Sequence, residues 1–214
     1  MRPTTLLVAI AACLAAPALA DCGDPGQYPT GLPDLSLSAV TVSYSGVATL
    51  LVVPDGSGAP FTAARGPGGA IVDATITLTL LEPCGPVPNF SRNDIWLEAL
   101  GTAFVACTGG TVADANADAD GRTHWALPLR AGGHEAMGCQ VVVNGSPLYQ
   151  VTPFNLRLVS PDLNGDRVVS LNDIPLFAQA FAGAYALRAD LHTDGAINLT
   201  DIPLLARAMG AHCH

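Results

Sequence analysis

A twelve-residue pattern occurs twice near the C-terminus, and it restricts the fold of this 214-residue chain more than any other feature. The first copy spans residues 162–173 and the second spans residues 190–201. In both copies, side chains that carry oxygen stand at positions 1, 5, 9 and 12, and Asn164 adds one at position 3 of the first copy. The spacing predicts two tight loops that turn several oxygen atoms toward one point.

These positions are the ligand positions of a twelve-residue calcium-binding loop of the EF-hand type. Calcium takes about six to eight oxygen ligands, and position 7 supplies one through its backbone carbonyl. We therefore predict that the chain binds two calcium ions. The predicted ligands of the first ion are Asp162, Asn164, Asp166, Val168, Ser170 and Asp173. The predicted ligands of the second ion are Asp190, Asp194, Ala196, Asn198 and Asp201.

Two positions depart from the pattern. Arg167 stands at position 6 of the first loop, where a glycine relaxes the sharp turn. His192 stands at position 3 of the second loop, where an imidazole nitrogen suits calcium poorly. We expect some strain in the first loop and weaker ion binding in the second. The alternative is a pair of Asp-rich turns that bind no ion, but a solvated turn does not require Asp at positions 1, 5 and 12 of both copies.

An apolar segment follows each loop, and the two segments also resemble each other. Residues 173–181 and 201–209 both begin Asp-Ile-Pro-Leu and continue with apolar residues at helical spacing. Asn172 and Thr200 are the expected N-caps, which places each proline in the first helical turn, where its missing donor is not needed. Each repeat is expected to be a loop followed by one short helix.

This duplicated loop–helix unit resembles the type I dockerin family over residues 160–209, including Asp at position 12 and an apolar residue at position 8. The resemblance implies a calcium-dependent module that docks an exported bacterial protein to a cohesin-like protein or surface scaffold, often in polysaccharide degradation. It also implies that loop positions 10 and 11 help to select the partner. These positions hold Leu171, Asn172, Leu199 and Thr200.

Leucine at position 10 differs from the small hydroxyl residues that are common there in that family. If Leu171 and Leu199 are exposed, they form matching apolar anchors for a protein partner. The alternative is that both leucines pack inward. The near repeat also implies two binding orientations related by a pseudo-twofold axis.

The N-terminal residues 1–20 have the composition of a signal peptide. A positive charge precedes an apolar run at residues 6–14, and Ala18-Leu19-Ala20 provides a small-residue cleavage site. The run is shorter than the roughly 20 apolar residues of a membrane-spanning helix, so we predict no transmembrane segment. We expect a secreted or cell-surface protein that begins near Asp21. Because Asp21 precedes Cys22, a lipid anchor on that cysteine is disfavoured.

Composition narrows the class of protein. The formal net charge is -9, so the positive surface that binds nucleic acid is not expected. Half of the residues are hydrophobic, which favours a folded chain over a disordered one. After a Gly- and Pro-rich leader at residues 21–34, apolar and polar residues alternate with a period of two, which indicates strands with one buried face. The predicted strands include residues 35–39, 47–53, 76–80, 95–100, 123–129, 140–143 and 154–158.

We therefore predict a mainly β fold. Residues 35–160 are expected to form an immunoglobulin-like antiparallel β-sandwich, because several short strands alternate with turn-forming residues. Asn144-Gly145 predicts a type I′ hairpin turn. The segments around residues 74–81, 86–88, 94–97 and 118–122 loosely resemble bacterial immunoglobulin-like domains. A small helical module at residues 161–210 and a tail at residues 211–214 follow the sandwich.

Five cysteines remain after the signal peptide, and in an exported protein we expect disulfides with one cysteine left over. We predict a Cys107–Cys139 bond, because both cysteines flank an Asp-rich turn at residues 114–120. That turn is either a third ion site or a solvated turn, and its missing closing carboxylate favours the turn. The tail residues His212, Cys213 and His214 are expected to be frayed rather than to bind a soft metal.

No catalytic residue set is recognisable. The pair His134-Glu135 begins like a zinc-protease helix, but Gly138 stands where the second histidine belongs, and no nucleophile-elbow motif occurs. We expect a protein without enzymatic activity of its own. Two alternatives stay open: a structural or adhesive surface protein in which calcium only stabilises the C-terminus, and a carbohydrate-binding β-sandwich. Aromatic residues are few, and Trp96 is expected in the core rather than as a sugar platform.

Overall fold

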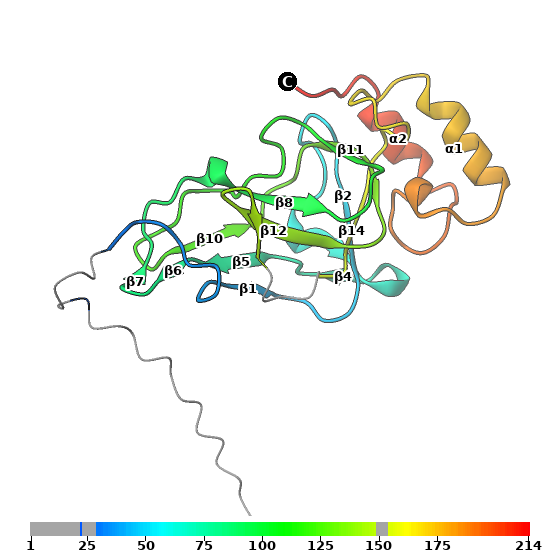
Figure 1. Cartoon of the computed structure of the whole chain (residues 1–214). Coiled ribbons are helices and arrows are strands. Elements are labelled where there is room, and N and C mark those ends of the chain that lie inside the picture. Colours follow the sequence, from blue (N-terminus) through cyan, green and yellow to red (C-terminus); the bar gives the residue numbers. More distant parts are fainter. Residues whose placement is uncertain (1–21, 23–28, 149–153) are drawn as a thin grey trace, which may run out of the picture.

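A computed structural model describes residues 22, 29–148 and 154–214, so the predicted signal peptide lies outside the described residues (Figure 1). Strands make up 29% and helices 16% of the structure, which confirms the mainly β class. No helix within the described ranges is long and apolar enough to cross a membrane.

The strands of the described residues form four sheets (Figure 1). One sheet has the order β1-β5-β10 and consists of β1 (Ala39–Val42), β5 (Ile76–Thr79) and β10 (Arg122–Trp125). A second has the order β13-β12-β8 and consists of β8 (Ile95–Ala99), β12 (Cys139–Val143) and β13 (Ser146–Pro147). The short strands β6 (Leu81–Glu82) and β7 (Gly85–Pro86) pair with each other.

The largest sheet has six strands and leads directly into the C-terminal repeats. Its order is β4-β3-β2-β14-β11-β9, with β2 (Ala48–Leu51), β3 (Ala64–Arg65), β4 (Ile71–Val72), β9 (Phe104–Ala106), β11 (Ala131–Glu135) and β14 (Leu156–Val159). One pair departs from the predicted antiparallel arrangement, because β14 runs parallel to β2 and sets Leu158 beside Leu50. Both strands therefore end at the same edge, where residues 161–214 begin.

Local hydrogen bonds decide two of the strand predictions. The predicted strand at residues 35–39 is wrong, because Asp34 accepts backbone bonds from Leu37 and Ser38 and closes a turn, so that β1 begins only at Ala39. The hairpin prediction is confirmed: Asn144 and Gly145 have φ angles of 49° and 79° and connect β12 to β13. Both left-handed φ angles are those that a type I′ turn requires.

Two hydrophobic clusters hold the chain together. The larger lies between the sheets and centres on Trp125, which is fully buried and donates its indole N–H to the Thr111 carbonyl over 3.0 Å. The prediction that Trp96 lies in the core is wrong, because Trp96 is only half-buried and does not belong to this cluster. The smaller cluster belongs to the C-terminal repeats, but it also contains Val53, which follows β2. The β-rich part thus contributes a side chain to the core of the C-terminal part.

The C-terminal unit, residues 161–210, contains two α-helices at one end of the sheets (Figure 1). Helix α1 spans Asp173–Ala182 and helix α2 spans Ile202–Ala208. A 3-10 turn, η4 (Leu187–Ala189), precedes the second loop. The prolines lie in the first turns as predicted. Other 3-10 turns are η1 (Phe61–Ala63), η2 (Pro67–Gly69) and η3 (Arg92–Asp94).

The predicted Cys107–Cys139 disulfide is wrong. Cys107 bonds to Cys213, and Cys22 bonds to Cys84. Cys139 is a free, fully buried thiol, because it belongs to β12 in a different sheet from β9, the strand that Cys107 follows. The tail is correspondingly not frayed, since the disulfide at Cys213 and a β-bridge between Val168 and His212 hold it.

Candidate metal centre

The two predicted loops adopt the same hydrogen-bonding pattern. In each, the carboxylate at position 12 accepts backbone N–H groups from positions 3 and 9 and so closes the loop. These bonds run from Asn164 and Ser170 to Asp173 over 3.1 and 2.8 Å, and from His192 and Asn198 to Asp201 over 2.8 Å each. A solvated turn would not need this closure twice, so the sequence repeat is also a structural repeat.

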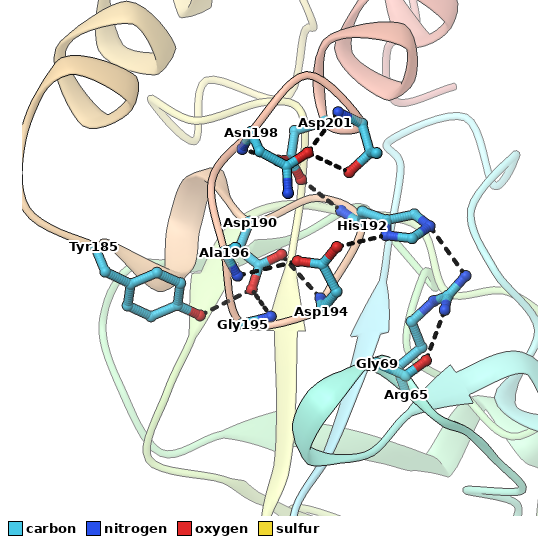
Figure 2. Close-up of polar contacts among 11 residues, drawn as sticks. Arg65, Gly69, Tyr185, Asp190, His192, Asp194, Gly195, Ala196, Asn198 and Asp201 are labelled. Carbon is cyan, nitrogen blue, oxygen red and sulfur yellow. Dashed lines mark hydrogen bonds and ion pairs between the residues drawn. The ribbon is translucent and has the colours of Figure 1, made fainter.

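The carboxylates at positions 1 and 5 organise the first half of each loop. Asp162 accepts backbone N–H groups from Gly165, Asp166 and Arg167 over 2.8, 3.2 and 2.7 Å. Asp190 accepts from Asp194 and Gly195 over 3.1 and 2.8 Å, and the Tyr185 hydroxyl donates to it over 2.9 Å (Figure 2). Position 5 in turn accepts the N–H of position 7, over 3.0 Å in both loops.

Both loops place left-handed residues at positions 4 and 6. Gly165 and Gly195 meet this need without strain, with φ angles of 72° and 88°. Arg167 has a φ of 71°, which confirms the expected strain in the first loop. Thr193 has a φ of 55° at position 4 of the second loop, so a β-branched residue is strained there as well. The sequence analysis did not anticipate the second strained residue.

Four carboxylates of the loops are buried without a basic partner. Asp162, Asp173, Asp190 and Asp201 are each at most 1% exposed. The ion pairs formed by the described residues do not include an arginine with any of them. A buried charge is costly unless a charge of opposite sign or a metal compensates it. Backbone N–H groups compensate these carboxylates in part, and a bound cation would supply the positive charge that no described side chain provides.

Two loop carboxyls have raised pKa values, and a third has a lowered one. Burial raises the pKa of Asp162 to about 6, and the neighbouring charges of Asp173 and Asp166 contribute to the rise. Burial also raises the pKa of Asp201, with the charges of Asp190 and Asp194 adding to it. The Asp194 pKa is lowered, chiefly by its hydrogen bond with His192. These three carboxylates are predicted ligands at position 1 of the first loop and at positions 5 and 12 of the second.

The chemistry of the donor set fits calcium. The predicted ligands are carboxylate, amide, hydroxyl and carbonyl oxygens, which suit a hard cation rather than a soft one. In the described ranges, no group of three or more His, Cys, Asp or Glu side chains already converges on one point. The carboxylate oxygens point at backbone N–H groups, but each carboxylate has about four lone-pair sites, so these bonds leave acceptor capacity for a cation.

His192 replaces Asn164 as the side chain that contacts the position-5 carboxylate, but it has no side-chain oxygen. The Asn164 amide donates to Asp166 Oδ2 over 2.9 Å, and His192 Nδ1 lies 3.1 Å from Asp194 Oδ2 (Figure 2). Behind the ring, Arg65 Nη2 lies 3.3 Å from Nε2. Arginine can only donate, so Nε2 accepts and Nδ1 carries the proton that it donates to Asp194. The ring orients the carboxylate but brings no oxygen ligand.

The β-rich part of the chain contacts both loops at glycines. A Cβ atom on Gly132 would lie 1.8 Å from Asp162 Oδ2, and the N–H of Gly133 donates to the Asp162 carbonyl over 2.8 Å. A Cβ atom on Gly69 would lie 3.0 Å from the Asp194 Cβ. The sequence analysis did not identify these contacts, although glycine inside strand β11 is a signal of close approach.

The predicted partner-binding residues lie on the surface. Leu171 and Leu199 are each 73% exposed, so the alternative in which they pack inward is wrong. Asn172 and Thr200 are also exposed. Asn172 is the N-cap residue of α1, as predicted, although its side chain makes no capping hydrogen bond, whereas the prediction of Thr200 as an N-cap is wrong. The N-cap of α2 is Asp201, and the Thr200 N–H and hydroxyl both donate to Asn198 Oδ1 over 2.8 Å, which places Thr200 in the loop.

An apolar groove lies between α1 and α2, the helices that follow these leucines in the sequence. It encloses about 430 Å³ and has the same four positions of each repeat along its walls. The lining residues are Ile174, Phe177, Ala178 and Phe181 from α1, and Ile202, Leu205, Ala206 and Met209 from α2. The sequence analysis found their helical spacing, but it did not predict that the two helices leave the face between them open.

In the Asp-rich segment at residues 114–120, two carboxylates accept hydrogen bonds from nearby backbone N–H groups. Asp118 accepts the backbone N–H groups of Asp120 and Arg122, and Asp114 accepts those of Ala126 and Leu127. These bonds show that Asp114 and Asp118 hold the turn, and the missing closing carboxylate still favours a solvated turn over a third ion site.

No family model matches the chain, and no curated protein and no solved structure matches it. The dockerin and immunoglobulin-like resemblances therefore rest on the residues of the repeats and strands themselves.

Proposed function

We propose that the chain is an exported, non-catalytic calcium-binding protein whose C-terminal unit docks it to a cohesin-like protein or surface scaffold, in a setting such as polysaccharide degradation. The observation that carries the proposal is the repeated closure of two loops around four buried carboxylates that have no arginine partner. Calcium would supply the missing positive charge. Oxygens at positions 1, 3, 5, 7, 9 and 12 would hold it in the first loop, and oxygens at positions 1, 5, 7, 9 and 12 in the second.

The docking part of the proposal rests on the surface beside the loops. Two equivalent leucines are exposed on the same unit that carries an apolar groove whose walls also repeat. Large apolar side chains exposed together are characteristic of interaction surfaces, and a few such residues carry most of the binding energy. A partner that covers Leu171, Leu199 and the groove would bury apolar area that water now contacts.

Calcium would act on this surface through the helix starts. Asp173 opens α1, and Asp201 is the N-cap of α2; the same two carboxylates close the loops. An ion bound at position 12 therefore fixes the loop end from which each helix and each exposed leucine projects. Partner binding should depend on calcium for that reason.

The test is a pull-down from the native secretome with the mature chain as bait, in calcium and in chelator. The expected result is a partner that is recovered in calcium, lost in chelator, and lost when Leu171→Asp and Leu199→Asp are combined. Leu127→Asp is the matched control, since Leu127 is an exposed leucine on the β-rich part. Equal recovery by the double variant would place the docking surface elsewhere.

A second candidate function is a structural one, in which calcium only stabilises the C-terminus. The observation in its favour is that the C-terminal unit is tied to the sheets by the Cys107–Cys213 disulfide and by Val53. Under this candidate, calcium raises the stability of the chain but chelator leaves its binding partners unchanged.

A further inference from the structure

The C-terminal tail lies along the first calcium loop and holds its second half. The N–H of Cys213 donates to the Arg167 carbonyl over 3.2 Å, and the N–H of Gly210 donates to the Val169 carbonyl over 2.8 Å. The N–H of Val169 donates to the Ala211 carbonyl over 2.8 Å, and Val168 forms an antiparallel bridge with His212. None of these three hydrogen bonds uses the carbonyl of Val168, the predicted ligand at position 7.

A disulfide fastens this tail to the β-rich part. Cys213 is bonded to Cys107, whose own N–H donates to the Arg130 carbonyl over 3.0 Å, directly before β11. Strand β11 supplies Gly132 and Gly133, which contact the other side of the loop at Asp162. The first loop is therefore held between β11 and a tail that is covalently linked to the β-rich part.

The second loop has no such support. In the described part of the chain, no backbone–backbone hydrogen bond joins residues 195–197 to another segment. Position 6 there is Gly195, which adopts its left-handed φ without strain. The first loop has Arg167 at that position with a φ of 71°, and the tail bonds to the carbonyl of this same residue. At position 6 the tail thus supports the strained residue of the first loop, whereas the strained Thr193 at position 4 of the second loop has no equivalent strap within the described residues.

We propose that the tail, residues 210–213, is a positioning strap for the first calcium loop, and that the Cys107–Cys213 disulfide makes the calcium affinity of this loop sensitive to thiol reductants. This inference rests on the proposed function. Cys107 is buried, whereas Cys213 is partly exposed, so an incoming thiolate reaches the Cys213 sulfur.

The chemical step balances with a dithiol as reductant. One thiolate of the dithiol attacks Cys213 Sγ, the Sγ–Sγ bond breaks, and Cys107 leaves as a thiolate that takes up a proton. The second thiol of the reagent then displaces Cys213. Two electrons and two protons pass to the protein, and the dithiol becomes a cyclic disulfide. The tail is then held only by its backbone hydrogen bonds and by the packing of Ala211 in the smaller hydrophobic cluster, and the strained backbone at Arg167 is freer to relax.

The experiment measures each loop separately in the full mature chain by calcium titration calorimetry. Asp190→Ala disables the second loop, so that the titration measures the first loop alone. Asp162→Ala disables the first loop, so that the titration measures the second alone. In each background, Cys107→Ser with Cys213→Ser removes the strap disulfide, and Cys22→Ser with Cys84→Ser removes the other one as a matched control. Circular dichroism checks that the β fold of each variant is retained.

The expected result is at least a tenfold loss of calcium affinity, about 1.4 kcal/mol, at the first loop when Cys107 and Cys213 are replaced. The second loop should change less than twofold, and the control pair should alter neither loop. Unchanged affinity at the first loop, or equal losses at both loops, would contradict the strap.

A second measurement tests the strap without any substitution, in case the double-serine variant fails to fold. The oxidised wild-type chain is treated with a dithiol, alkylation at Cys213 is confirmed by mass, and calcium affinity is measured again. A tenfold loss supports the strap, and no loss overturns it. Absence of calcium binding by the oxidised wild-type chain is a different outcome, because it contradicts the proposed function itself.

Discussion

Gly132 leaves the space that the Asp162 side chain occupies, since a Cβ atom at residue 132 would lie 1.8 Å from Asp162 Oδ2. The first residue of the first loop is thus seated against strand β11 of the β-rich part. Asp194 is seated in the same way on Gly69, in the turn between β3 and β4. The two loops are therefore fitted to the sheets rather than carried on a free linker.

Replacing Gly132 with alanine should displace Asp162, the first residue of the first loop, from its position against β11. Because the atom that the new Cβ would meet is the loop carboxylate itself, either Asp162 or the backbone must move, and overpacking of this kind costs about 1–3 kcal/mol. We expect a fall of that size in the free energy of unfolding in calcium. Gly66→Ala is the matched control, since its new Cβ would lie 3.3 Å from a Val72 methyl group and no closer than 3.8 Å to a backbone oxygen, with an ordinary φ of -80°. Urea unfolding of both variants provides the comparison, and equal values would contradict the seating.

Exchanging the residue types at positions 164 and 192 should reverse which of the two loops has the higher calcium affinity. His192→Asn would restore an amide oxygen at position 3 of the second loop and raise its calcium affinity by about five- to tenfold, or roughly 1 kcal/mol. Asn164→His should lower the affinity of the first loop by a similar factor. Each change is measured with the other loop disabled by its Asp-to-Ala replacement at position 1. An unchanged calcium affinity of the second loop in His192→Asn would mean that Arg65 and the His192 ring do not limit the affinity of that loop.

The metal-free protein should lose stability as the pH rises through about 6 because of Asp162. Burial raises the pKa of this carboxyl in the folded state to about 6, above its value of roughly 3.9 in an unfolded chain. Protonation therefore favours the folded state, and the contribution is fully present below about pH 4 and lost as the pH rises through about 6.

The measurement is the difference in the free energy of unfolding between wild type and Asp162→Asn, in chelator, from about pH 4 to pH 7. The wild type should lose stability relative to the variant over this window, since an amide does not titrate. A constant difference would contradict the raised pKa. Saturating calcium serves as the control, because the ion takes the place of the proton on the carboxylate.

The cysteines should divide into two bonded pairs and one protected thiol. Burial raises the pKa of the Cys139 thiol, which lowers its thiolate fraction and its reactivity. Iodoacetamide at neutral pH should label no cysteine of the folded chain and one cysteine of the denatured chain. Non-reducing peptide mapping should link Cys107 to Cys213 and Cys22 to Cys84. Labelling of Cys139 in the folded state would place it outside the core.

The sequence predicted what short-range spacing controls. Loop closure, the helix positions, the hairpin at Asn144-Gly145 and the mainly β class all depend on residues close together in the chain. It did not predict contacts between distant segments. The disulfide partner of Cys107, the glycine seats and the parallel pairing of β2 with β14 depend on which sheet edge each segment reaches. The exposure of Leu171 and Leu199 also depends on that tertiary arrangement, because either packing suits the sequence.

Thermal stability should depend on calcium through both loops. A ligand that binds only the folded state stabilises it by about 2.7 kcal/mol at a hundredfold excess over its dissociation constant. We expect a higher melting temperature in millimolar calcium than in chelator, and a residual shift when only one of Asp162 and Asp190 is replaced by alanine. Superimposable melting curves of the wild type in the two buffers would contradict this expectation.

Calorimetric titration of the oxidised mature chain with calcium tests the central claim most directly. The account predicts binding of two ions with unequal affinities, the weaker one at the loop that contains His192, and no binding once Asp162→Ala and Asp190→Ala are combined. Heat that is unchanged in the double variant, or absence of binding by the wild-type chain, would contradict the assignment of these loops as calcium sites.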